Sequence, residues 1–165
     1  MTLVIPPLGC APCEASAAPA PTAPAPLAHD GWWPGVDLTR LRAEARLRDS
    51  VTAERLTEAA IGAMIWVGEQ LEVWRVAQVA AGYGALANVL SAEIAGESRL
   101  VILYRQAVTA FTKAALVERY RDFDLTGAGE RRVEELDASV GELRRDAIHA
   151  VRAILGRTRT DVELI

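Results

Sequence analysis

The prolines of this chain are confined to one end. All eight lie at or before Pro34, and residues 35–165 have none. Proline fixes φ and lacks a backbone N–H donor, so it interrupts helices and sheets. The stretch Ala15–Ala28, ASAAPAPTAPAPLA, has a proline at nearly every second or third position, which favours an extended, polyproline II-like segment. We therefore expect an extended N-terminal arm over residues 1–36.

The rest of the chain has the composition of a helical protein. Ala, Leu, Arg and Glu, all strong helix formers, dominate residues 37–156. The 165 residues are 51% hydrophobic and 24% charged, which suits one globular domain. We predict an all-α fold, a bundle of about four helices of which three are long, with the Pro/Ala-rich arm before it and an extended C-terminal strand after it.

Helical periodicity places the first two helices. The first should cover residues 37–48, with Asp37 as its N-cap. The second should begin at Thr52, run to about Ala80 and end at Gly82, a natural left-handed C-cap. Its apolar face is formed by Leu56, Ala60, Ala63, Val67, Leu71 and Trp74. Trp66 and Trp74 are interpreted as core or interface anchors.

Two further helices follow a connector over residues 83–96. The third should begin near Glu97 or Ser98, and it is apolar around most of its circumference, which is typical of a central helix. Its narrow polar stripe consists of Arg105, Thr109, Thr112 and Lys113. The fourth should open after residues 126–129 and end at Gly156, with a packing seam of Val133, Leu136, Val140, Leu143, Ala147, Ala150 and Ile154.

The third helix ends in ERYRDFD, a dense run of charge over Glu118–Asp124. This run is either a charged helix end or the edge of a surface that meets another subunit. The candidates for contacts between subunits are Glu118, Arg119, Tyr120, Arg121 and Asp124. We expect Arg119 or Arg121 to pair with an acid of this chain or of its neighbour, and both also suit the negative end of the helix dipole.

The last nine residues change period from helical to alternating. RTRTDVELI alternates in the manner of a β-strand, and no second strand is evident in the chain to pair with it. Such a segment is either a frayed tail or a strand that adds to the sheet of another protein. The predicted docking residues are Arg157, Thr158, Arg159, Thr160, Asp161, Val162, Glu163, Leu164 and Ile165.

Several functional classes lack their sequence signals. There is no Gly-rich phosphate loop, nucleophile elbow or metal-ligand spacing, so neither an enzyme nor a bound cofactor or metal is expected. Cys10 and Cys13 form CAPC, but a redox pair or zinc site is disfavoured in a Pro-rich arm with only His29 nearby. No targeting signal or membrane span is evident, so we expect a soluble cytoplasmic protein.

A spaced pattern of residues across the chain resembles a known family. It comprises GES at 96–98, Tyr104, Ala107-Val108, ERYR at 118–121, Asp124, Thr126, Gly129, Asp137, Glu142-Leu143, Arg145-Asp146, Ala150-Val151 and Ile154. Upstream it includes Arg55-Leu56, Glu58-Ala59, Met64, residues 80–82 and the opening MTLVIP. Over Asp37–Ile165 this is similar to the head completion proteins of peduoviruses, temperate phages with contractile tails; the Pro-Ala run and CAPC depart from that pattern.

The resemblance implies a structural virion protein rather than an enzyme. It implies a head–tail connector, whose copies are expected to form a twelve-fold ring beneath the portal protein after DNA packaging. The ring would extend the DNA channel, stabilise the filled head and provide a platform for the next neck or tail-completion protein. The resemblance thus implies a place at the virion neck, with assembly in the host cytoplasm and no membrane partner.

The charge of the chain is compatible with a channel that DNA passes without specific binding. The net charge is −4, and an acidic ring would repel phosphates rather than hold them. The rival hypothesis is a phage DNA-binding module, either a regulator or a small packaging subunit, since RLTEAAIGAM could open a helix-turn-helix. A tail or baseplate protein fits the composition equally well.

Overall fold

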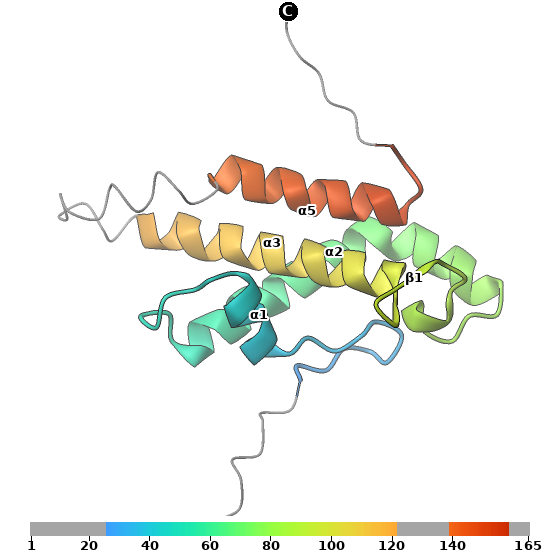
Figure 1. Ribbon diagram of the computed structural model, residues 1–165, viewed down its shortest axis with the longest axis horizontal. Helices are drawn as coiled ribbons and strands as arrows, with labels where there is room; N and C mark the ends of the chain where they lie inside the picture. The colour runs from blue at the N-terminus through green and yellow to red at the C-terminus, as the bar shows by residue number, and fades with distance from the viewer. Residues whose placement is uncertain (1–25, 122–138, 159–165) are drawn as a thin grey trace, which may run out of the picture.

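The computed structural model describes residues 26–121 and 139–158. In these ranges four α-helices form a bundle, with a short 3₁₀ helix and a small hairpin between the second and third (Figure 1). Helix α3 lies in the middle and packs against both α2 and α5, whereas α2 and α5 make few direct contacts with each other. The helical bundle is therefore confirmed, with a two-stranded sheet added to it.

The segment before α1 is part of the body rather than of an arm. Leu27 and Val36 exchange two backbone hydrogen bonds of 2.8 and 2.9 Å, which close a loop. Trp32 and Trp33 lie in that loop and are buried. The N-terminal arm was expected to extend to residue 36, and this boundary is too late. Burial of the two large indole rings holds the loop against the helices. Residues 1–25, including Cys10 and Cys13, lie outside the described part.

Helices α1 (Leu38–Glu44) and α2 (Ala53–Ala80) begin where their caps predict. The Asp37 side chain accepts hydrogen bonds from the N–H groups of Thr39 and Arg40, and Thr52 accepts one from Arg55. Helix α1 is shorter than predicted, because the backbone turns at Arg46 with a φ of 51°.

The apolar face predicted for α2 is buried. Leu56, Ala60, Ala63, Val67 and Leu71 are inaccessible or nearly so, and Trp66 and Trp74 pack against the core. Gly82 follows the helix with a φ of +95°, which confirms the left-handed C-cap.

The connector contains structure that an all-α prediction omits. It holds the 3₁₀ helix η1 (Leu86–Asn88) and the antiparallel strands β1 (Glu93–Ile94) and β2 (Glu97–Ser98). The turn between the strands has Ala95 and Gly96 both at positive φ, as a two-residue type I′ hairpin requires. Alanine is a poor residue for that conformation, so the turn has no strong sequence signal.

Helix α3 (Arg99–Arg121) is central, as its apolar circumference predicts. Trp66 of α2 stacks on Phe111 with ring centroids 4.4 Å apart, and Trp33 stacks on Tyr104. The polar stripe is only partly exposed: Thr112 is fully buried and bonds to the Val108 carbonyl, and Lys113 is 8% exposed. Among the described helices, α3 also has the length and apolarity of a membrane span, a test that the central helix of a bundle passes as well.

Helix α5 (Val140–Ile154) begins later than the predicted fourth helix. Ser139 is its N-cap, with an extended ψ of 155°, and it forms a capping box with Glu142. This reciprocal bonding starts a new helix at Val140 even though the apolar spacing continues from upstream. The seam from Leu143 to Ile154 is buried as predicted, and Gly156 follows the helix at a φ of 69°. The seam residues Val133 and Leu136 lie outside the described part.

Candidate interaction surfaces

The end of α3 is tied to both neighbouring helices by ion pairs. Arg119 Nη1 donates to Glu58 Oε1 of α2 at 3.0 Å, and Arg144 Nη2 of α5 donates to Glu118 Oε2 at 2.5 Å. The prediction that Arg119 or Arg121 pairs with an acid is confirmed for Arg119, within the chain. Tyr120 and Arg121 belong to α3, but only their backbone is described, and Asp124 lies outside the described residues.

These pairs are exposed to solvent. The side chains of Arg119 and Glu58 are 62% and 68% accessible, and those of Arg144 and Glu118 are about half accessible. Exposed ion pairs add little to folding stability because water screens them. The charges at this end of the bundle therefore remain accessible to a partner, and their contact with other subunits stays a prediction.

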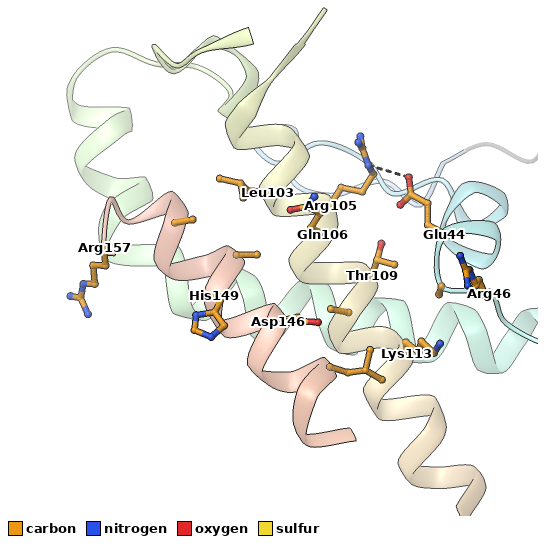
Figure 2. Close-up of a pocket in the computed structure, with 15 residues that line it drawn as sticks. Glu44, Arg46, Leu103, Arg105, Gln106, Thr109, Lys113, Asp146, His149 and Arg157 are labelled. Carbon is orange, nitrogen blue, oxygen red and sulfur yellow. Dashed lines mark ion pairs between the residues drawn. The ribbon is translucent and has the colours of Figure 1, made fainter. Parts of the chain in front are cut away.

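A groove of about 810 Å³, lined by both apolar and polar residues, lies between the end of α1, α3 and α5 (Figure 2). Arg105 of α3 is held at one side by Glu97 at 2.6 Å and Glu44 at 3.5 Å. The hydrogen bond from Arg105 lowers the pKa of Glu97, so this carboxylate stays charged. Lys113, Asp146 and His149 also line the groove.

Some polar atoms near the groove have no protein partner in the described residues. Thr109 Oγ1 and both ring nitrogens of His149 are inaccessible and make no hydrogen bond there. Buried polar groups are nearly always paired in folded proteins. These are therefore unpaired polar atoms, among the described residues, at the contact between α3 and α5. Sequence reasoning placed Thr109 on a polar stripe but gave no reason to select His149.

The side of α2 that faces away from the core also carries apolar residues. Its exposed large hydrophobic residues are Ile61, Ile65, Val73, Val76 and Val79. Val73 is 88% accessible. Exposed Glu69 and Glu72 lie among these apolar residues, so the outer side of α2 is mixed in character. Helical periodicity predicts only the core side of α2, although the exposed apolar residues also recur at helical spacing.

The C-terminal tail is described only at its start. Arg157 and Thr158 follow α5, have no regular secondary structure and are exposed. Arg152 Nη2 donates a hydrogen bond to the Thr158 carbonyl at 3.1 Å. Arg157 also lines the groove. Residues 159–165, which make up most of the predicted docking strand, lie outside the described part, so the strand stays a prediction.

Comparison with known proteins decides the family. The model for the phage head completion protein (GPL) matches residues 27–165. The chain belongs to this family. The head completion/stabilization protein of Escherichia phage P2 is similar to it, with 37% identity over 134 residues, which is 81% of this chain and 79% of that protein. No solved structure matches.

Family membership agrees with the resemblance read from the spaced residues. Head completion proteins are structural components associated with the phage head. The family is not a known class of enzyme. In the residues that the structure describes, no cluster of His, Cys, Asp or Glu is able to hold a metal ion.

The DNA-binding alternative loses its structural basis in the described body. A helix-turn-helix would need a turn soon after RLTEAAIGAM, at residues 55–64. Helix α2 continues without interruption through this stretch to Ala80. The segment is therefore one long bundle helix and not the first half of a two-helix motif.

Proposed function

We propose that this head completion protein acts as a head–tail connector. In this proposal its copies form a ring under the portal protein after DNA packaging, extend the DNA channel, stabilise the filled head and present a platform for the next neck or tail component. The single observation that supports this most is the family match over residues 27–165, which spans the whole bundle and the C-terminal tail.

The architecture suits lateral assembly. Because α3 is central, α2 and α5 each keep an outer side that is not used by the bundle. A subunit of a ring needs two such sides, one for each neighbour. The net charge of −4, repeated around a ring, would keep the packaged DNA mobile in the channel rather than bound to it.

The tail is our proposed attachment to the portal. Residues 157–165 alternate β-branched or apolar residues with charged ones, so they can add as a strand to a sheet edge. Val162 and Leu164 would fill shallow apolar sites, and Arg159 and Asp161 would set the register. Each backbone hydrogen bond contributes only about 0.5–1.5 kcal/mol net, so attachment would depend on many copies binding together.

Deletion of Thr158–Ile165 tests the attachment. The truncated protein should keep its helical circular dichroism spectrum but fail to co-sediment with purified portal, and phage that depend on it should yield filled heads that leak DNA and cannot join tails. Wild-type occupancy of the truncated protein on portals would transfer docking to the helices. A full-length protein that stays monomeric and ignores portal would contradict the connector function as a whole.

A matched pair of substitutions separates strand pairing from side-chain chemistry. Thr160→Pro removes a backbone donor and fixes φ, whereas Thr160→Val preserves strand propensity and shape. Portal binding should be weakened by the first and retained by the second. Equal binding of the two variants would argue against strand addition at this position.

A further inference from the structure

The outer side of α2 carries acids among its apolar residues. Helical spacing places Ile61, Ile65, Val76 and Val79 on one side, opposite the buried stripe that contains Val67 and Leu71. Glu69 and Glu72 are exposed on this same side. We call this set, from Ile61 to Val79, the α2 outer face.

The outer side of α5 carries bases around one exposed apolar residue. Ile148 is 46% accessible, and helical spacing puts Arg144, Arg145 and Arg152 on its side of the helix. Leu143, Ala147 and Ala150 lie on the opposite side and are buried against the bundle. We call the four outward residues the α5 outer face.

The two faces cannot cover each other within one chain. Both helices pack against α3, and each turns its buried stripe toward the bundle, so each outer face looks away from it. The α2 outer face extends about 27 Å along its helix, and the 15-residue α5 is about 22 Å long. The faces are thus opposite in charge and similar in length.

We propose that the α2 outer face of one copy packs on the α5 outer face of the next, so that copies join head to tail. This rests on the proposed ring and specifies which surfaces build it. Ile148 and the aliphatic stems of Arg144 and Arg145 would cover Ile65 and its apolar neighbours, because long basic side chains bury their stems while their charges reach carboxylates. Glu69 would meet the Arg145 guanidinium. Glu72 and Arg144 already form ion pairs within the chain, with Arg75 and Glu118 respectively.

A symmetric pair of α2 outer faces is the competing arrangement, and charge disfavours it. In an antiparallel pair of identical helices, residues near the centre of the face meet their own copies. The centre of Ile61–Val79 falls beside Glu69, so two like charges would meet there at the two-fold axis. Like charges in contact oppose such an association. The basic α5 outer face has no such conflict with α2.

Charge reversal on each face, followed by its rescue, tests the proposal. We expect the wild-type protein to self-associate in sedimentation velocity at low salt. Glu69→Arg or Arg145→Glu alone should weaken self-association at least tenfold, because each places like charges across the contact. The double variant, and a one-to-one mixture of the two single variants, should restore it to within about threefold of wild type.

The controls distinguish a specific contact from an effect of net charge. Glu93→Arg changes the charge as much as Glu69→Arg does, but it lies on β1, outside both faces, and should associate as the wild type does. If Arg145→Glu had no effect while Glu69→Arg did, the α5 outer face would be excluded. Failure of the double variant and of the mixture to recover, or a wild-type protein that is monomeric up to its solubility limit, would overturn the proposal.

A cross-linking experiment provides a readout that does not depend on affinity. In a protein whose Cys10 and Cys13 are replaced by serine, a copy with Ile65→Cys mixed with a copy with Ile148→Cys should form a disulfide-linked dimer on oxidation. Neither copy alone should do so. Cross-linking within a sample of Glu69→Cys alone would indicate the symmetric α2 pair instead, because the two copies of residue 69 would meet at its two-fold axis. Portal binding, measured separately on the tail variants, shows whether the connector function stands if this contact does not.

Discussion

Trp33 stacks on Tyr104, with ring centroids 5.0 Å apart and planes inclined by 15°. The contact joins the loop before α1 to the N-terminal part of the central helix. Trp32 meets Trp33 edge to face at 4.6 Å and donates its indole N–H to the Tyr83 carbonyl at 3.1 Å. The loop is thus anchored to α3 and to the start of the connector between α2 and α3.

Removing the stacked ring should destabilise the whole body. Trp33 is 3% exposed, so Trp33→Ala leaves a large cavity beside Tyr104. We expect the free energy of unfolding in urea, followed by far-UV circular dichroism, to fall by about 3–5 kcal/mol. Trp33→Phe keeps an aromatic ring and should lose clearly less. A loss below about 1 kcal/mol in Trp33→Ala would show that the loop is not part of the core.

Tyr104 should make the protein sensitive to alkali. Burial, assisted by the nearby negative charge of Asp30, raises the pKa of Tyr104 above that of a free phenol. The unfolded chain therefore loses this proton first, so the folded state loses stability as pH rises above about 10. Tyr104→Phe should lessen the decline in urea midpoint above that pH. An identical decline in both proteins would assign it to other groups.

The capping box should set the start of α5. Ser139→Ala removes the acceptor for the Glu142 N–H and should cost about 0.5–2 kcal/mol, whereas Ser139→Asn can accept the same bond. Hydrogen exchange should show the loss in the amides of the first turn of α5. Unchanged protection there in Ser139→Ala would mean that packing against α3 alone defines this end.

The ion pair of Glu58 and Arg119 should matter little for folding. Because both side chains are mostly exposed, a double-mutant cycle of Glu58→Ala and Arg119→Ala should give a coupling below about 1 kcal/mol. The same variants measured for self-association would show whether these charges serve a neighbouring copy. A coupling above about 2 kcal/mol in the isolated chain would make the pair structural.

The sequence predicted the ends of a helix well where the capping residues lie within one turn of that end. Thr52 and Gly82 mark the two ends of α2 because a hydroxyl cap and a left-handed glycine act within one turn. Ser139 carries an equally local signal, with Glu142 three residues later, yet the apolar seam that runs through it obscured the helix start. Periodicity reports which side is buried, and it does not report where a helix begins.

Long-range packing was beyond the same reasoning. Trp32 and Trp33 follow a proline-rich stretch, and only their contacts with Tyr104 and Trp74 show that they belong to the core. The α2 outer face was missed for the opposite reason. Helical spacing assigned Val67 to the core side of α2, and it gave no sign that Ile65, on the opposite side, belongs to a second apolar set.

The positions of the four tryptophans make the bundle its own spectroscopic reporter. Trp32, Trp33 and Trp74 form one cluster of edge-to-face rings, and Trp66 stacks separately on Phe111. No tryptophan lies in residues 1–25, 122–138 or 159–165. Intrinsic tryptophan fluorescence would therefore follow the folded body alone. Coupling between the clustered indoles should also give a distinctive near-ultraviolet circular dichroism spectrum. Binding of the tail could then be monitored with a dye attached there, without overlap between the two signals.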